Sequence, residues 1–204
     1  MIIGIDFDGV LTDLAKFFYE EGEKFAKENK IKICKNESGY NTLEYFGWTK
    51  DDDIKFWSTN NLKYTKFVNA KESAKEVLQK LKDEGHKIII ITARYGCDWD
   101  NDYGKEQRKI SEEWLKRNEI SYDEICYVGE TSKVSTIIDK EIDIFIDDSV
   151  KNLEEVSKIV PVICFDEQYN RNYENPKMKR LSSWDDIYDY LNDEICKGEN
   201  CENT

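Results

Sequence analysis

The sequence predicts an α/β protein built on a Rossmann-like, doubly wound parallel sheet. Short apolar runs rich in Ile and Val recur along the chain, and several of them are apolar on both faces. Such runs are typical of parallel strands that helices cover on both sides. The runs that predict strands lie at residues 2–5, 88–91, 125–128, 142–146 and 160–165.

Helical patterns alternate with these runs. They lie at residues 70–84, 105–118, 133–140 and 150–159. Gly85 follows the first of them, which fits the preference for glycine directly after a helix end. Strict alternation of strand and helix predicts parallel strands joined by helical crossovers.

Residues 14–69 interrupt this alternation, because they contain no convincing strand. Residues 14–30 and 51–62 have helical patterns, and the whole segment is rich in aromatic residues. We expect a small helical unit that has its own core and also caps a ligand site. The predicted division is a catalytic core at residues 1–13 and 70–204 and a helical cap at residues 14–69. The candidate rings for contact with a substrate are Phe18, Tyr45 and Trp48.

The chain is strongly acidic, with 43 Asp and Glu, 30 Lys and Arg, and a net charge of −13. Such a surface repels nucleic-acid polymers and anionic membranes at long range, so we expect neither as a partner. A small phosphorylated ligand is still permitted, because a metal ion and local donors can reverse the field inside a pocket. The sequence does not define the oligomeric state.

Cysteine and histidine spacing excludes several classes of site. The chain has 6 Cys without a C-x-x-C pair, and His86 is its only histidine. Neither a common zinc site nor a dense disulfide scaffold fits this pattern. Met1 leads directly into the first apolar run, and no apolar run is long enough to cross a bilayer. We therefore expect a soluble, cytoplasmic protein.

Acidic, hydroxyl and basic side chains follow four of the predicted strands. Ligands of open parallel sheets bind outside the carboxyl ends of the strands, so these side chains are expected to share one edge. Asp6 and Asp8 are two residues apart, which directs both side chains to the same side of an extended chain. Gly9 permits a sharp turn and a close approach of backbone N–H groups to a phosphate. The other candidates at this edge are Thr92, Ala93, Arg94, Lys133, Asp147 and Asp148.

The acidic residues of this set predict a divalent cation. Asp6 directly follows an apolar strand, and the adjacent Asp147 and Asp148 close another, where their charges repel each other. Helix capping explains a single Asp after a strand, but it does not explain three acidic residues at one edge of the sheet. A bound metal ion resolves the repulsion. Asp6 and Asp8 also suit the roles of nucleophile and proton donor, provided that their environments push their pKa values apart.

The order of these groups resembles the four motifs of the haloacid dehalogenase superfamily. The block from Asp6 through Asp8 to Thr12 is similar to the first motif, Asp-x-Asp-x-Thr/Val. The residues that match the second, third and fourth motifs are Thr92, Lys133, Asp147 and Asp148. The segment at residues 14–69 has the position of the superfamily's type-1 cap. Within the superfamily, the core segments resemble the 5′-nucleotidase C group, which includes 5′(3′)-deoxyribonucleotidases.

The resemblance implies a phosphomonoesterase that works through an aspartyl-phosphate. In this mechanism Asp6 is the nucleophile, while Asp8 protonates the leaving oxygen and then activates water. The resemblance also implies that Thr92 and Lys133 hold the phosphoryl oxygens. The backbone at Gly9 and Ala93 provides further candidates for phosphate binding.

Mg²⁺ is the cofactor that the resemblance implies. Its ligands would be the Asp6 carboxylate, the Asp8 carbonyl and one of the acidic pair, with Asp147 preferred over Asp148. A few carboxylates with water molecules completing the shell are the ligands that Mg²⁺ tolerates. Phosphoryl transfer depends mainly on positioning and charge neutralisation, which this set supplies.

Several residues have competing interpretations. Lys140 is the alternative to Lys133, but it lies near the far end of its predicted helix. Arg94 either contacts the substrate or forms a surface salt bridge. His86 is expected to be structural, because it lies at the opposite edge of the sheet. The acidic residues 51–53 are expected to begin a solvated helix rather than bind a metal.

The substrate has alternatives as well. A nucleoside or deoxynucleoside 5′-monophosphate is expected, with its base stacked on rings of the cap. The same chemistry would suit a sugar phosphate, another small phosphomonoester or a polynucleotide 3′-phosphate. A binding module that keeps the fold without catalysis is the third interpretation, which the presence of all four motifs disfavours.

Overall fold

The computed structural model describes residues 1–129 and 133–201, with side chains described as far as residue 194. A six-stranded parallel sheet lies at its centre, in the order β3-β2-β1-β4-β5-β6. The strands are β1 Ile2–Ile5, β2 Lys87–Thr92, β3 Glu124–Tyr127, β4 Ile144–Asp147, β5 Val162–Phe165 and β6 Met178–Leu181. The predicted doubly wound parallel sheet is confirmed. The sequence pattern did not predict β6.

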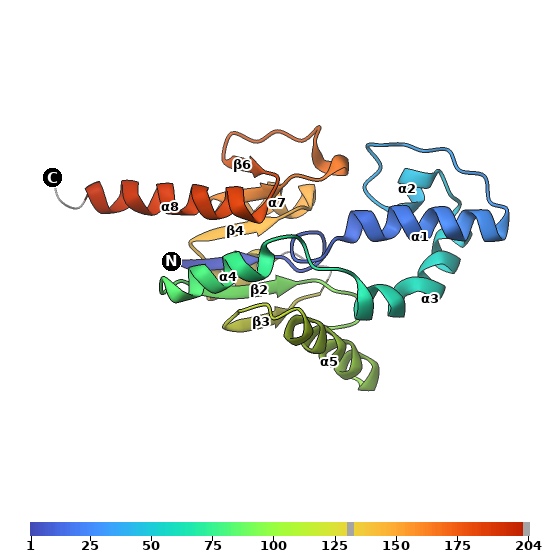
Figure 1. Cartoon of the computed structure of the whole chain (residues 1–204), viewed down its shortest axis with the longest axis horizontal. Helices are drawn as coiled ribbons and strands as arrows, with labels where there is room; N and C mark the ends of the chain where they lie inside the picture. Colours follow the sequence, from blue (N-terminus) through green and yellow to red (C-terminus); the bar gives the residue numbers. More distant parts are fainter. Residues whose placement is uncertain (130–132, 202–204) are drawn as a thin grey trace.

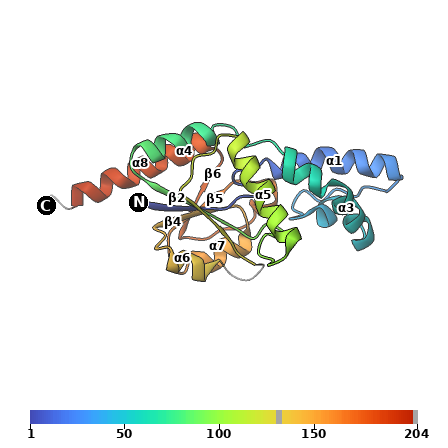
Figure 2. The same cartoon turned by 90° about the horizontal axis from the view of Figure 1, so that it is seen from below.

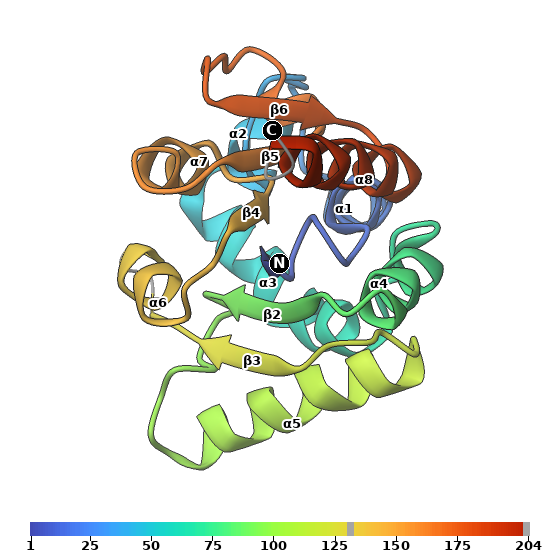
Figure 3. The ribbon, with the colours of Figure 1, turned by 90° about the vertical axis from the view of Figure 1, so that its left-hand side faces the viewer.

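Helices cover both faces of the sheet because the strands are apolar on both sides. In β2, Ile88 and Ile90 pack into one core, while Ile89 and Ile91 pack into the other, and all four are fully buried. The first core contains residues of α4, α5 and α8, and the second contains residues of α6 and α7. Figure 3 shows α4 and α8 on one side of the sheet and α6 and α7 on the other. These helices are α4 Ala74–Asp83, α5 Asp102–Arg117, α6 Val134–Asp139, α7 Val150–Val156 and α8 Trp184–Cys201.

Three helices form the insertion between β1 and α4, which are α1 Leu14–Asn29, α2 Thr42–Phe46 and α3 Lys50–Phe67. They lie beyond the carboxyl ends of the strands, as Figures 1 and 2 show. Thr49 begins α3 through a capping box with Asp52, whose side chain accepts from the Thr49 N–H. Phe25, Phe46 and Phe56 belong to an aromatic core of the insertion.

The two connections between insertion and core run side by side. The Asp13 N–H donates to the Asn69 carbonyl at 2.9 Å, and the Lys71 N–H donates to the Leu11 carbonyl at 2.8 Å. An antiparallel bridge pairs Thr12 with Ala70 at the same place. These contacts support the division into a core at residues 1–13 and 70–204 and a cap at residues 14–69, which we retain as a proposal.

Two buried tryptophans hold the ends of these connections. The Trp184 indole N–H donates to the Val10 carbonyl at 3.1 Å, and the Trp114 indole N–H donates to the Val68 carbonyl at 2.8 Å. Both side chains are fully buried. Helices α8 and α5 therefore fix the loop after β1 and the end of α3. Within the described part of the chain, no helix is long and apolar enough to span a membrane.

Packing of α1 against α2 leaves no room for a side chain at position 22. A Cβ added to Gly22 would stand 2.2 Å from Cε2 of Phe46. We predict that Gly22→Ala lowers the free energy of unfolding by about 1–3 kcal/mol through overpacking. Helix propensity alone would raise it by about 1 kcal/mol, so the sign is diagnostic.

Urea unfolding of the two proteins measures this difference. Glu28→Ala on the exposed side of α1 is the control, with an expected change within about 0.5 kcal/mol. Stabilisation by Gly22→Ala would contradict the close packing of α1 and α2.

Candidate active site

Two adjacent strands carry the acidic residues of the site. Asp6 directly follows β1, and Asp147 ends β4 with Asp148 directly after it. The Asp6 N–H donates to the Ile146 carbonyl at 2.9 Å. Each carboxylate offers one oxygen, and these oxygens lie within 4.8 Å of one another. The structure therefore brings these three predicted site residues together.

This acidic cluster is buried and carries more negative charge than the described residues around it neutralise. Lys133, which is 2% exposed, donates to Asp6 and also to Asp147 Oδ2 at 2.8 Å. Burial raises the pKa of Asp6 to about 7, with Lys133 opposing this and the Asp147 and Asp8 charges adding to it. Burial, with the Asp147 and Asp6 charges, also raises the pKa of Asp148 well above its ordinary value. One lysine does not balance three buried carboxylates, so the cluster favours a divalent cation.

Asp147 and Asp148 differ in their hydrogen bonds. Asp147 Oδ1 accepts from the Ser149 N–H at 2.8 Å, and Oδ2 accepts from Asn152 Nδ2 at 3.0 Å in addition to the lysine. The Asp148 carboxylate accepts from the Tyr169 hydroxyl, and no second described residue donates to it. Asp148 is therefore the carboxylate with the greater unmet need for a cation.

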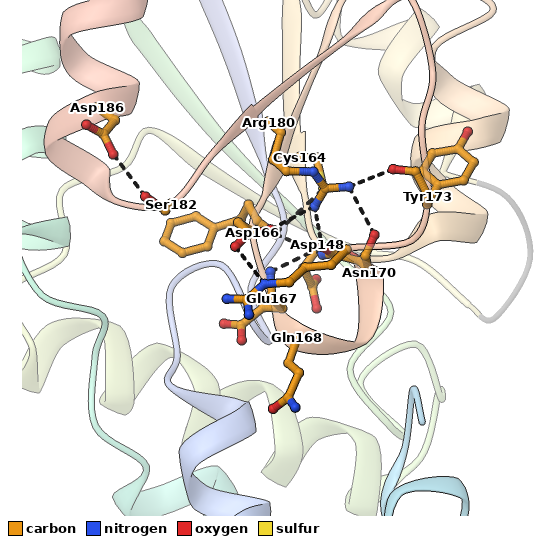
Figure 4. Close-up of polar contacts among 12 residues, drawn as sticks. Asp148, Cys164, Asp166, Glu167, Gln168, Asn170, Tyr173, Arg180, Ser182 and Asp186 are labelled. Carbon is orange, nitrogen blue, oxygen red and sulfur yellow. Dashed lines mark hydrogen bonds and ion pairs between the residues drawn. The ribbon is translucent and has the colours of Figure 1, made fainter. Parts of the chain in front are cut away.

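Asn170 and Arg180 hold the backbone that presents Asp148. Asn170 Nδ2 donates to the carbonyls of Asp148 and Phe165, both at 2.9 Å. Arg180 of β6 donates to Asn170 Oδ1 at 2.6 Å and to the Tyr173 carbonyl at 2.7 Å (Figure 4). The edge strand β6 thus supports the backbone at Asp148 through a chain of hydrogen bonds.

Asp8 lies in a more open part of the site, with its side chain 23% exposed. The Tyr64 hydroxyl donates to Asp8 Oδ1, and Arg94 Nη2 lies 3.1 Å from the same oxygen. The Arg94 guanidinium stacks 4.2 Å from the centre of the Phe7 ring, and Nη1 donates to Ser111 Oγ at 3.2 Å. Burial and the Asp8 charge raise the pKa of Tyr64 well above its ordinary value, so the hydroxyl keeps its proton. Arg94 is buried in the site rather than paired on the surface.

The other predicted phosphate-binding residues lie at the same edge. Thr92 ends β2, beside β1, and its Oγ1 accepts from the Arg94 N–H at 3.2 Å. Ala93 follows it and is exposed. Gly9 has a φ of +89°, and its N–H donates to Thr12 Oγ1 at 3.1 Å. The N–H of Gly9 is therefore engaged within its own loop.

The three aromatic residues expected to contact a substrate lie in the core of the insertion. Phe18, Tyr45 and Trp48 are buried there, with 5.9 Å between the ring centres of Phe18 and Tyr45. A cavity of about 800 Å³ opens beside Asp8, between α3 and the start of α5, and none of the three lines it. The aromatic residues that line this cavity are Trp57, Tyr64, Tyr95 and Tyr103.

The other residues with competing interpretations, Lys140, His86 and residues 51–53, lie away from the acidic cluster. Lys140 donates to Glu124 near the amino end of β3. His86 Nδ1 lies 3.3 Å from the amino-terminal nitrogen of Met1. Residues 51–53 form the first turn of α3. Among these residues the geometry thus offers no alternative to Lys133.

Comparison with protein families decides the class of this site. The model of the family "5′ nucleotidase, deoxy (Pyrimidine), cytosolic type C protein" matches residues 1–195 of the 204-residue chain. The chain belongs to this family. It is therefore a nucleotidase-type phosphatase with a haloacid dehalogenase-like fold, an enzyme that hydrolyses phosphomonoesters.

Individual relatives of this nucleotidase family span nearly the whole chain. The "Putative 5′(3′)-deoxyribonucleotidase" of Chlorobaculum tepidum is 28% identical over 198 residues, which cover 94% of this chain and 90% of the relative. The "Putative nucleotidase" of Halalkalibacterium halodurans is 27% identical over 183 residues, covering 89% and 87%. The solved structure of a haloacid dehalogenase-like hydrolase from Streptococcus pneumoniae aligns with a TM-score of 0.63 at 13% identity, covering 93% of this chain and 97% of the other. This last similarity shows the fold alone.

Several residues of the nucleotidase site had no signal in the sequence. Tyr64 lies in α3, far along the chain from Asp8, and nothing in its spacing marks it. Tyr169 and Asn170 lie in a short 3₁₀ helix after β5, beyond the last predicted strand. Asn152 is the exception, because it is in the first turn of the helix after the acidic pair, where an amide can face the strand ends.

Gly9 gives a test of this geometry. A Cβ at this position would stand 2.3 Å from Asp148 Oδ2, and its φ of +89° is also unfavourable for alanine. We predict that Gly9→Ala displaces the Asp148 carboxylate and lowers kcat/KM for phosphomonoesters by roughly 100-fold.

Gly85→Ala is the matched control. Gly85 has a φ of +86°, but a Cβ there would meet nothing within 4 Å. Its alanine variant is expected to lose about 1 kcal/mol of stability while keeping its activity. Equal activity losses in the two variants, measured by phosphate release, would contradict the proposed clash.

Proposed function

We propose that the protein is a Mg²⁺-dependent nucleoside and deoxynucleoside 5′-monophosphatase that forms an aspartyl-phosphate on Asp6. The observation that carries this proposal is the buried cluster of Asp6, Asp147 and Asp148 around Lys133, beside the open Asp8. A buried nucleophile, a phosphate-binding cation and an accessible proton donor are what phosphoryl transfer to a carboxylate requires.

The oxygen ligands of this site fit Mg²⁺, the ion that phosphatases of the haloacid dehalogenase superfamily generally use. Carboxylate and carbonyl oxygens are the ligands that this ion prefers. Asp6, Asp148 and the Asp8 carbonyl would hold it. Both oxygens of Asp147 already accept hydrogen bonds, which favours Asp148 over Asp147, the ligand that the sequence resemblance prefers. When bound, the ion neutralises charge on the cluster and on the phosphoryl group.

The side chains divide the reaction into two steps. An Asp6 oxygen bonds to phosphorus, the bond from phosphorus to the leaving oxygen breaks, and Asp8 gives that oxygen a proton. Water then attacks phosphorus, Asp8 takes the water's proton, and the bond between Asp6 and phosphorus breaks to release phosphate. Lys133 and Thr92 hold the phosphoryl oxygens throughout. Thr92 ends β2, and the Lys133 side chain reaches Asp6 and Asp147 at the strand ends, which supports this role.

The cavity beside Asp8 supports a nucleoside as the leaving group. Its volume is in the range of small-molecule sites, and aromatic side chains provide faces on which a base can stack. Asp53 and Glu106 also line it, and Arg94 is the only cationic side chain among its described lining residues. This excess of acidic side chains disfavours a leaving group that carries a second phosphate, and it also disfavours a polynucleotide substrate. Tyr95 and Tyr103 therefore replace Phe18, Tyr45 and Trp48 as our candidates for contact with the base.

The proposed compartment is the cytoplasm. Cys34, Cys97, Cys126 and Cys164 are all free thiols. Free thiols are the usual state of cysteine in a reducing compartment.

Phosphate release from a panel of phosphomonoesters tests the proposal. With Mg²⁺, the wild-type protein should hydrolyse nucleoside or deoxynucleoside 5′-monophosphates, and a chelator should abolish the activity until Mg²⁺ is restored. Asp6→Asn should lower kcat by at least about 1,000-fold, because it removes the nucleophile while keeping its shape. Asp123→Asn, at the amino end of β3, is the control and should keep activity within about twofold.

The same panel distinguishes the alternative substrates. Sugar phosphates and 3′-phosphorylated oligonucleotides should show kcat/KM values at least about tenfold lower than the preferred nucleotide. A higher value for either would assign the enzyme to that substrate. Failure of the wild-type protein on the entire panel would contradict the enzyme proposal itself.

A further inference from the structure

Tyr64 is a residue of the insertion whose hydroxyl reaches the core. It donates to Asp8 Oδ1 and lies 2.9 Å from Thr12 Oγ1, and both partners belong to the loop after β1. The ring packs 5.1 Å from the Phe17 ring and 5.8 Å from the Trp57 ring. The tyrosine is 5% exposed, so neighbouring side chains fix the position of its hydroxyl.

The direction of these hydrogen bonds is determined by the available protons. A tyrosine hydroxyl has one proton, and a carboxylate oxygen only accepts, so Tyr64 donates to Asp8. The Thr12 hydroxyl must then donate to the Tyr64 oxygen. Thr12 Oγ1 itself accepts from the Gly9 N–H. The chain of donors therefore runs from the loop backbone through Thr12 and Tyr64 to Asp8.

The hydrogen bond from Tyr64 and the ion pair with Arg94 both involve the same oxygen of Asp8. Arg94 Nη2 lies 3.1 Å from Oδ1, which is also the acceptor for Tyr64. No described residue donates to Oδ2 of Asp8. Asp8 also lines the cavity between α3 and the start of α5. Oδ1 can accept the Tyr64 hydrogen bond whether or not Oδ2 carries a proton. Oδ2 is therefore the oxygen that remains available for proton transfer.

We propose that Tyr64 is a positioning residue that holds Asp8 with Oδ2 directed at the leaving oxygen. This inference rests on the proposed acid and base role of Asp8. The hydroxyl comes from α3, whereas Asp8, Thr12 and Arg94 belong to the core. Asp8 is thus oriented for proton transfer only when the insertion sits against the core as it does here.

Tyr64→Phe tests the proposal, because it removes the hydroxyl and keeps the ring. On the preferred nucleoside monophosphate, kcat should fall roughly 10- to 100-fold, a part of the usual contribution of a general acid and base. KM should change less than about twofold, since the ring still lines the cavity. Tyr19→Phe is the matched control, because the Tyr19 hydroxyl also links insertion to core, donating to Gln168 Oε1 at 3.3 Å, but does not contact Asp8.

A second substrate separates positioning from general damage. With p-nitrophenyl phosphate, Asp6 bonds to phosphorus and p-nitrophenolate leaves with its electron pair without needing a proton. Hydrolysis of the aspartyl-phosphate still needs the base. Tyr64→Phe should therefore give a rapid burst approaching one p-nitrophenolate per enzyme, followed by slow turnover. Structural damage would instead shrink the burst.

The possible outcomes separate this inference from the proposed function. A Tyr64→Phe enzyme with wild-type kcat, or with a raised KM alone, overturns the positioning role while the nucleotidase activity stands. A wild-type protein inactive on every phosphomonoester overturns both. Circular dichroism checks folding. If Tyr64→Phe does not fold, Thr12→Val removes the donor to the Tyr64 oxygen, and an unchanged kcat in that variant overturns the inference.

Discussion

The negative charge buried at the carboxyl ends of β1 and β4 constrains the rest of this phosphatase. Burying several carboxylates costs free energy unless cations and hydrogen-bond donors compensate for it. Lys133 supplies one positive charge, and the backbone and amide donors around Asp147 supply further compensation. Asp148 keeps only the Tyr169 hydroxyl among the described donors. The remaining charge favours a divalent cation, and such a cation would also attract an anionic phosphoryl group. The buried negative charge of the carboxylates therefore lowers the stability of the fold and also underlies the proposed chemistry of the site.

Much of the surrounding structure holds these charges in place. Arg180 and Asn170 connect the edge strand β6 to the backbone of Asp148. Trp184 fixes the loop after β1 through the Val10 carbonyl. On the other side of the site, the insertion supplies the Tyr64 hydroxyl to Asp8. The insertion therefore does more than cover the site, because it also contributes to the environment of Asp8, the proposed general acid and base.

The sequence alone was sufficient for the parts of the site that follow from strand ends. Asp6 and Asp147 are predictable because each ends a continuous apolar run, and parallel strands present their carboxyl ends at one edge. The strand β6 was not predictable, because the adjacent charges Lys179 and Arg180 fill the middle of this four-residue strand at an edge of the sheet. Tyr64 was not predictable because its contact with Asp8 spans 56 residues and depends on how α3 packs. Aromatic content likewise identified a helical unit with its own core, but packing alone distinguishes rings of that core from rings that line the cavity.

A crystal structure with Mg²⁺ and trifluoroberyllate tests the central claim most directly, because this anion mimics a phosphoryl group on a carboxylate. We expect beryllium bonded to an Asp6 oxygen, and Mg²⁺ at about 2.0–2.1 Å from oxygens of Asp6 and Asp148. Lys133 should contact a fluoride. Mg²⁺ bound away from this cluster, or beryllium on another residue, would contradict the account.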